Sequence, residues 1–348
     1  MSARENLQAA AADRILIFDG AFGTQIQERG LSEEDYAGDL GLSADQKGNN
    51  DILALTRPDV IADITRAYLE AGADVVSTNT FSANTISQAD YAAEDKVRDI
   101  NIASARIARE LADEYQAKDS RPRFVAGAIG PTNKTLSLSP DVEDPGFREI
   151  DFDTLVGVYR EQAAALVEGG ADFILIETIF DTLNAKAGIF AVRQLEAELG
   201  RDVPIMLSMT LTDLSGRNLS GHTVEAFWYA VRHANPVTIG LNCSFGAEQL
   251  RPHVQLLSDI ADTLVLAYPN AGLPNDLGEY DEEPETTAAL VRRWAENGRV
   301  NILGGCCGST PAHIAEIAKA VEDLSPRAIP ERDTKMRLAG LEPFTIAA

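Results

Sequence analysis

Eight short apolar runs, each followed by a longer amphipathic stretch, limit the folds that this 348-residue chain can adopt. The runs are continuous and rich in β-branched residues, which is typical of strands that are covered on both faces. Several amphipathic stretches end in glycine, as at Gly72 and Gly170, and glycine is the usual C-terminal cap of a helix. The expected strands span residues 15–18, 74–78, 124–129, 173–177, 205–210, 238–242, 264–268 and 301–304. The expected helices span residues 60–71, 95–116, 152–169, 183–199, 224–234, 247–261, 286–296 and 311–324.

Eight consecutive strand–helix units predict an α/β fold, a (β/α)8 TIM barrel that forms a single domain. A doubly wound open sheet is the alternative, but it usually has fewer strands and a glycine-rich fingerprint after the first one. The segment Asp19-Gly20-Ala21-Phe22-Gly23-Thr24 lacks that fingerprint. We expect an N-terminal extension at residues 1–13, the barrel at residues 14–324 and a linker-like tail at residues 325–348.

The composition excludes several classes of protein. A net charge of −24 opposes binding to the phosphate backbone of nucleic acids. No apolar run approaches the roughly 20 residues that span a bilayer, and the first residues lack the basic-then-apolar order of a signal peptide. Three cysteines, two of them adjacent, make a poor disulfide framework. We therefore expect a cytoplasmic protein that binds neither nucleic acid nor membranes.

All three cysteines follow expected strands. Cys243 follows the sixth strand, and Cys306 and Cys307 lie in a glycine-flanked turn after the eighth. A barrel places its chemistry at the C-terminal ends of its strands, and the ends of the sixth and eighth strands flank that of the seventh. We therefore expect the three thiols to converge, with Asn270 between them at the end of the seventh strand.

Three converging thiols form a soft ligand set, for which zinc in tetrahedral geometry is the usual cytosolic metal. Bound thiolates are deprotonated, so three of them on one Zn²⁺ make an anionic centre that is a poor Lewis acid for activating water. Such a centre suits another task, which is to hold a substrate thiol as a thiolate that can still attack an electrophile. The pattern thus predicts that a substrate thiol is alkylated at a metal held by Cys243, Cys306 and Cys307.

Other interpretations of the cysteine pattern stay open. The adjacent pair could be two small buried residues in a tight turn, or the three thiols could form a closed structural zinc site. Structural zinc sites favour Cys-x-x-Cys spacing on flexible knuckles rather than barrel strand ends. A phosphate site at the glycine-rich turn would lack a partner lysine or arginine. A redox disulfide between adjacent cysteines would be strained.

Two carboxylates also stand at strand ends. Asp19 follows the first strand, and Glu177 ends the fourth. Together they can hold the ammonium group of an amino acid, whereas Asp19 alone could instead cap the turn that follows it. Backbone N–H groups in the glycine-rich turn at residues 20–24 could bind the substrate carboxylate.

Seven motifs along the chain carry a family resemblance. They are Asp-Gly-Ala-Phe-Gly-Thr-Gln, Thr-Asn-Thr-Phe, Ala-Ile-Gly-Pro-Thr-Asn, Glu-Thr-Ile-Phe-Asp-Thr-Leu-Asn, Gly-Leu-Asn-Cys-Ser, Tyr-Pro-Asn-Ala-Gly-Leu-Pro and Gly-Gly-Cys-Cys-Gly-Ser-Thr-Pro. Together they resemble the homocysteine S-methyltransferase family, and most closely the N-terminal homocysteine module of cobalamin-dependent methionine synthases. The resemblance covers residues 14–324. The stretch from Met336 to Phe344 also resembles the linker into the folate-binding module of those enzymes.

The resemblance implies particular roles for the site residues. Zinc would be bound by Cys243, Cys306 and Cys307, which are thereby catalytic. Asn270 is implied as the fourth ligand, which the thiolate of homocysteine would replace. Asp19 and Glu177 would lie near the substrate amino group. The full set of residues expected to bind homocysteine is Asp19, Gly20, Phe22, Gly23, Thr24, Thr80, Glu177 and Asn270.

The resemblance also implies that the methyl donor is methylcobalamin, supplied by a partner domain or subunit, and that the product is methionine. Cobalamin-binding and folate-binding modules would lie in the same chain or act in trans. Because this sequence ends where the folate module would begin, we expect either a fragment or a split enzyme. Two rival functions are a homocysteine methyltransferase that uses betaine or S-methylmethionine, and a non-catalytic zinc-stabilised barrel subunit.

Overall fold

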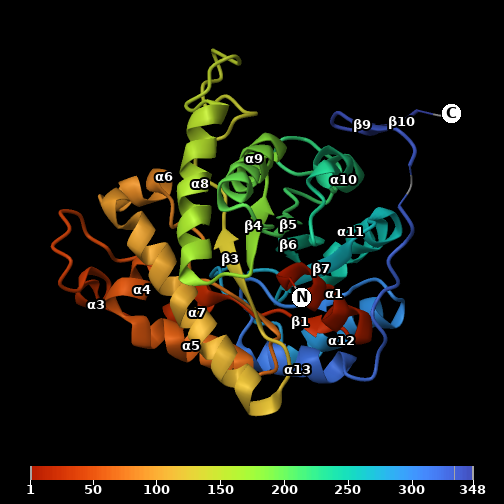
Figure 1. Ribbon diagram of the computed structural model, residues 1–348, viewed down its shortest axis with the longest axis horizontal. Coiled ribbons are helices and arrows are strands. Elements are labelled where there is room, and N and C mark those ends of the chain that lie inside the picture. The colour runs from red at the N-terminus through yellow and green to blue at the C-terminus, as the bar shows by residue number, and fades with distance from the viewer. Residues whose placement is uncertain (1, 333, 347–348) are drawn as a thin grey trace.

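Eight parallel strands form a closed barrel at the centre of the molecule (Figure 1). The computed structural model describes residues 2–332 and 334–346. The strands pair in the order β1-β8-β7-β6-β5-β4-β3-β2, and a parallel bridge between Phe18 and Val75 joins β1 to β2. The predicted (β/α)8 barrel is therefore confirmed. The strands are β1 (Leu16–Ile17), β2 (Val75–Ser77), β3 (Phe124–Ile129), β4 (Phe173–Ile179), β5 (Ile205–Met209), β6 (Thr238–Gly246), β7 (Leu264–Asn270) and β8 (Ile302–Leu303).

The helices between the strands pack around the outside of the barrel (Figure 1). Local capping sets their ends: Asp151 accepts a hydrogen bond from Thr154 N at the start of α8, and Gly170 has left-handed backbone at its end. The eight expected helices correspond to α5 (Pro58–Glu70), α7 (Val97–Asp119), α8 (Phe152–Gly169), α9 (Thr182–Leu199), α10 (Val224–Val231) with η4 (Arg232–Ala234), α11 (Ala247–Ile260), α12 (Pro284–Glu296) and α13 (Pro311–Val321).

Two apolar layers explain why the strand sequences are apolar without interruption. Leu16 belongs to the core inside the barrel, while its neighbour Ile17 belongs to the core between the strands and the helices. Successive side chains of a strand point to opposite faces, so both must be apolar where both faces are covered. Helix α1 (Ala3–Asp13) adds Leu7 and Ala11 to the inner core.

Several short elements were not predicted from periodicity. One group lies in the long connection after β1, another lies before α7, and α1 precedes the barrel. They are α2 (Phe22–Glu28), α3 (Glu33–Ala37), η1 (Asn50–Ile52), α4 (Leu53–Thr56), α6 (Thr85–Gln88), η2 (Ala89–Tyr91) and η3 (Glu94–Lys96). The tail forms an antiparallel hairpin, β9 (Arg337–Ala339) and β10 (Pro343–Thr345), which contacts α10. The elements of three to seven residues are too short for a periodic pattern to reveal them, and α1 buries only Leu7 and Ala11 among its eleven residues, which leaves a weak apolar pattern.

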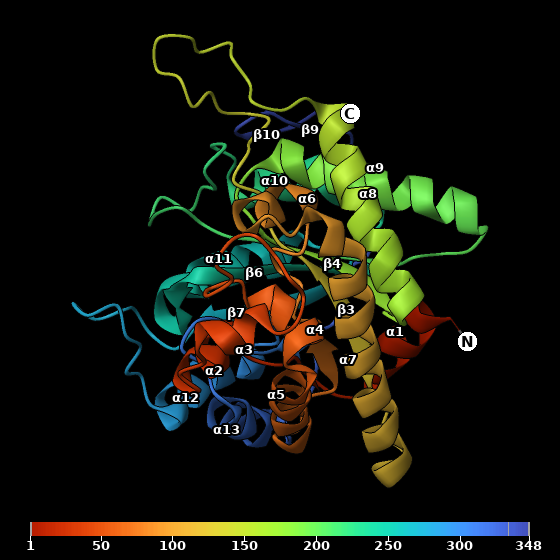
Figure 2. The ribbon, with the colours of Figure 1, turned by 90° about the vertical axis from the view of Figure 1, so that its left-hand side faces the viewer.

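The loops after β3, β5 and β7 project beyond the C-terminal ends of the strands, on the same side of the molecule (Figure 2). Loops on this rim are where barrel enzymes place their binding and catalytic groups. Within the described ranges, no helix combines the length and the apolar character needed to cross a membrane.

Candidate active site

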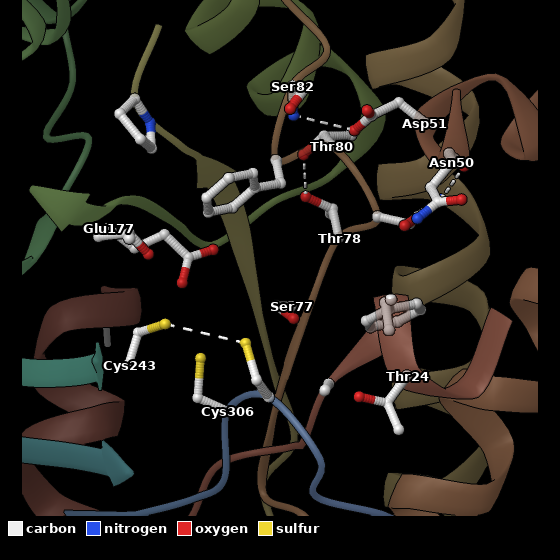
Figure 3. Close-up of a pocket in the computed structure, with 18 of the residues that line it drawn as sticks. Thr24, Asn50, Asp51, Ser77, Thr78, Thr80, Ser82, Glu177, Cys243 and Cys306 are labelled. Atoms are coloured by element: carbon white, nitrogen blue, oxygen red, sulfur yellow. Dashed lines mark hydrogen bonds between the residues drawn. The ribbon is translucent and has the colours of Figure 1, made fainter. Parts of the chain in front are cut away.

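A cavity of about 670 Å³ opens at the C-terminal ends of the strands (Figure 3). Most of the predicted site residues line it. They are Asp19, Gly20, Phe22, Gly23, Thr24, Thr80, Glu177, Cys243, Cys306 and Cys307. The remaining one, Asn270, is buried at the end of β7, behind the lining.

The three cysteine sulfurs converge on one wall of this cavity (Figure 3). Their Sγ atoms all lie within 4.8 Å of one another, and 3.8 Å separates the Sγ atoms of Cys243 and Cys307. The thiols are free, since a disulfide bond measures about 2.05 Å. Zn–S bonds of about 2.3 Å in tetrahedral geometry place sulfur ligands about 3.8 Å apart. The donor set and its spacing fit one tetrahedral zinc ion.

Irregular backbone positions two of the site residues. Cys243 and Ser244 have left-handed backbone, with φ of 60° and 61°, where the register between β6 and β7 shifts. Thr178, next to Glu177, has φ of 53° at a similar irregularity between β4 and β5. Such conformations cost on the order of 1–3 kcal/mol each in non-glycine residues and gather at functional sites. Both irregularities re-aim a predicted site residue, as β-bulges near active sites do.

Asn242 connects these two irregular segments. Its Oδ1 accepts hydrogen bonds from Ser208 Oγ (2.7 Å) and Thr178 N (3.2 Å), and its Nδ2 donates to Thr178 Oγ1 (2.9 Å). Nδ2 also lies 4.0 Å from Cys306 Sγ. The side chain is fully buried. One amide therefore ties β4, β5 and β6 together beside the thiols.

The pKa values of the three thiols differ, which favours a negative charge on Cys307. Hydrogen bonds from the thiols of Cys243 and Cys306 lower the pKa of Cys307 well below its ordinary value. The hydrogen bond between Cys243 and Cys306 helps to raise the pKa of Cys306 well above its ordinary value. Three thiolates at this spacing would repel one another, so full ionisation needs a cation between them. The electrostatics of the cluster therefore agree with its geometry as a site for a metal cation.

Asn270 lies beside the turn that carries the adjacent cysteines. Cys306 N donates to Pro269 O (2.7 Å) and Ala271 N donates to Cys307 O (2.9 Å), so the backbone on both sides of Asn270 is bonded to that turn. Its Oδ1 is buried and has no hydrogen-bond partner among the described residues. A buried acceptor without a partner, in a residue next to the turn that carries Cys306 and Cys307, suits a fourth metal ligand. That role stays a prediction.

Asp19 and Glu177 face the cavity as buried carboxyl groups. Asp19 accepts hydrogen bonds from Ser77 N (2.7 Å) and Ser77 Oγ (2.9 Å), while Tyr268 donates its hydroxyl proton to Glu177 (3.0 Å). Ser77 is on β2, so Asp19 joins two strands and does not cap the turn that follows it. Burial raises the pKa of Asp19 to about 8 and that of Glu177 to about 7. A substrate ammonium group between them would favour their charged forms.

The N-terminus of α2 borders the same cavity. In the described chain, the backbone N–H groups of Phe22, Gly23 and Thr24 have no acceptor, whereas Ala21 N donates to Ser309 Oγ (3.3 Å). Three unused donors at a helix start favour a bound carboxylate. Gly20 is required just before them, because a Cβ there would lie 2.8 Å from Tyr68 Cε1.

Thr80 contributes to the wall of the cavity. Its hydroxyl donates to Ala128 O (2.7 Å) and lies 2.6 Å from Thr78 Oγ1. The hydroxyl proton of Thr80 is therefore bonded within the protein, although the side chain lines the cavity. The contact of Thr80 with the substrate stays a prediction.

Sequence reasoning missed two tyrosines and one carboxylate of the site. Tyr268 supports Glu177, and Tyr280 lies next to Cys307, where burial and the negative sulfur raise the pKa of Tyr280 to about 12. Asp51 lines the cavity from the long connection after β1. Of these three residues, only Tyr268 could have been predicted from the sequence, because it lies at the C-terminal end of an expected strand.

Comparison with known proteins agrees with this geometry. A family model described as homocysteine S-methyltransferase matches residues 16–321. The metallated form of the homocysteine methyltransferase MmuM from Escherichia coli is similar in structure, with a TM-score of 0.69 at 22% identity over 90% of this chain and 99% of that one. Its oxidized form gives a TM-score of 0.68 at 22% identity, over 88% and 95% of the two chains. At this identity the solved structures establish a shared fold, while the family match spans the whole barrel.

Proposed function

Since this chain belongs to the homocysteine S-methyltransferase family, we propose that it is a zinc-dependent enzyme that transfers the methyl group of methylcobalamin to the thiol of homocysteine. The products are methionine and demethylated cobalamin. The observation that carries the proposal is the convergence of three free cysteines at the ends of β6 and β8, at the spacing of zinc ligands.

The protein's contribution to the zinc site is to fix its donors. Cys243, Cys306 and Cys307 would hold the ion, and Asn270 would complete the set in the absence of substrate. Zinc bound there supplies a centre that keeps the homocysteine sulfur a thiolate at neutral pH. The left-handed backbone at Cys243 and the amide of Asn242 would hold the sulfurs in place before metal or substrate arrives, which their geometry supports.

Two other groups of residues would orient homocysteine. Asp19 and Glu177 would bind its ammonium group, and the Tyr268 hydroxyl holds Glu177 in position. The unused N–H groups of residues 22–24 would bind its carboxylate. With the ammonium and carboxylate groups of homocysteine both held, its short side chain would direct the sulfur toward the cysteines.

Exposed apolar side chains at the rim of the barrel support the proposal that the methyl donor is carried by a protein partner. Val142, Leu214 and Leu277, on the projecting loops after β3, β5 and β7, are 91%, 72% and 82% exposed. Apolar side chains on projecting loops suit a protein partner that covers the mouth. We propose that this partner is the cobalamin-binding module of a methionine synthase, in the same chain or in another, alongside a folate-binding module.

Zinc K-edge absorption with and without homocysteine tests the proposal. We expect three sulfurs and one light atom without substrate, and four sulfurs with it. A sphere that does not change would instead indicate a structural zinc site. Cys243→Ala is expected to lose zinc and activity together, and full activity in that variant would overturn the assignment.

The choice of donor is tested separately. Methionine formation from homocysteine is measured with methylcobalamin, betaine and S-methylmethionine in turn. Turnover with one of the small donors alone would favour that branch of the family. Unfolding on chelation, with no thiol binding, would favour a zinc-stabilised barrel without catalysis.

A further inference from the structure

Homocysteine as placed above uses only part of the cavity. Its contacts lie on the side of the cysteines, Asp19, Glu177 and the start of α2. The wall opposite the cysteines comes from the connection after β1 and the segment after β2, and residues 131–133 and Phe180 complete the lining. The polar side chains of this second wall belong to Asn49, Asn50, Asp51, Thr78, Asn79, Thr80, Ser82, Ser87, Asp90 and Tyr91.

Asp51 is the unusual member of this second wall. It is 6% exposed, and its carboxylate accepts one hydrogen bond within the described chain, from Ser82 N (3.1 Å). Figure 3 shows Asp51 with Ser82 and Thr80, across the cavity from Cys243 and Cys306. A carboxylate has room for about four hydrogen bonds. Asp51 therefore keeps acceptor capacity at the cavity surface, and burial raises its pKa to about 7.

The cavity contains no charge that would compensate Asp51. Four carboxylates line it, those of Asp19, Asp51, Asp90 and Glu177, and its described lining includes no lysine, arginine or histidine. Asp19 and Glu177 are accounted for by one substrate ammonium group. Asp51 is not, and a buried carboxylate without a partner is costly to ionise. Its natural complement is a ligand group with positive or positively polarised hydrogens.

We propose that Asp51 anchors a second subsite in this cavity, which binds the methyl donor through a positively polarised group and excludes anionic donors. The proposal rests on the proposed methyltransfer function and deepens it. Carboxamide N–H groups at the edge of a corrinoid and the methyl groups of a small sulfonium donor share this chemistry. Either would place the donor across the cavity from the cysteines, on the side from which a methyl group must approach the homocysteine sulfur.

The test is Asp51→Asn in the zinc-loaded full chain. Asparagine keeps the shape and can still accept the hydrogen bond from Ser82 N, so the change removes the charge and leaves the loop contact. Asp39→Asn is the matched control, since Asp39 is exposed, lies in the same connection and does not line the cavity. Both variants lose one negative charge from the same region of the chain.

Binding and kinetics are measured with free methylcobalamin and with S-methylmethionine. In Asp51→Asn we expect an approximately tenfold higher Kd and KM for the donor, as loss of one charged hydrogen bond implies. The KM for homocysteine and the zinc content should not change, and Asp39→Asn should match the wild type throughout.

Three outcomes would overturn the subsite. A shift in the KM for homocysteine alone would assign Asp51 to the amino-acid site. No shift in either constant, or lower thermal stability of Asp51→Asn with unchanged donor binding, would make Asp51 a structural loop contact. A wild-type protein that binds neither donor also rejects the subsite. If S-methylmethionine reacts and methylcobalamin does not, the proposed donor is wrong while the effect of Asp51→Asn on the working donor still decides the subsite.

Discussion

Asn242→Ala tests whether the fold holds the thiols in place before a metal binds. The side chain makes hydrogen bonds to Ser208 Oγ, Thr178 N and Thr178 Oγ1, and it is fully buried. Its removal leaves the Thr178 N–H group and the Ser208 hydroxyl without these partners in the interior. Each unsatisfied buried group costs about 1–3 kcal/mol. We therefore expect the free energy of unfolding to fall by ~2–6 kcal/mol, which leaves a protein in the upper part of the usual stability range folded.

Loss of the Asn242 amide should also weaken metal binding. Cys243 is the next residue and has left-handed backbone, which persists only where surrounding contacts enforce it. Removing a residue that orients metal ligands typically lowers affinity about 10- to 100-fold. We expect this range for zinc, measured by competition with a chromophoric chelator, and urea unfolding of the zinc-free protein gives the stability term independently.

Ser208→Ala supplies the control in a double-mutant cycle. If Asn242 and Ser208 act through their shared hydrogen bond, the two stability losses will add to more than the loss in the double variant. Additive losses would show that the hydrogen bond is not the source of the effect. Unchanged zinc affinity in Asn242→Ala, together with a stability change below about 0.5 kcal/mol, would refute the whole argument.

Three further predictions concern Cys243, Asp51 and Arg327. Cys243→Ala should retain less than one equivalent of zinc per chain by atomic absorption, and a retained full equivalent would exclude it as a ligand. The pKa of Asp51 rises from 3.8 when unfolded to about 7 when folded, so its contribution to stability is full below pH 4 and is lost as pH rises through 7. Zinc-free Asp51→Asn should therefore equal the wild type near pH 4 and exceed it by a few kcal/mol at pH 8 in urea unfolding, and identical curves at both pH values would contradict the burial argument. Arg327, buried beside the N-terminal ends of β7 and β8, donates to Ser258 O and Ala261 O at the end of α11. Arg327→Ala should therefore cost about 3 kcal/mol by thermal unfolding, with Arg332→Ala as the exposed control.

Local sequence determined the strands and helices of the barrel. A strand covered on both faces must be apolar at every position, so runs such as Phe124–Ile129 identify themselves without reference to the rest of the chain. Helix α8 was predicted at its observed bounds because its amphipathic spacing and its caps are also local. Once eight such units occur in order, the barrel topology brings the ends of the sixth and eighth strands together. The convergence of Cys243 with Cys306 and Cys307 could therefore be predicted as well.

Other features depended on contacts between segments far apart in the sequence. The hydrogen bonds of Asn242 to Ser208 and Thr178, the left-handed backbone at Cys243 and the position of Asp51 in the cavity wall leave no periodic or spacing signal. The physical reason is that the spacing of apolar residues within one element shows which of its faces is buried, and this spacing can be read without knowing the other elements. Hydrogen-bond partners, backbone strain and a cavity lacking positive side chains are properties of several segments at once, so only the tertiary structure decided them.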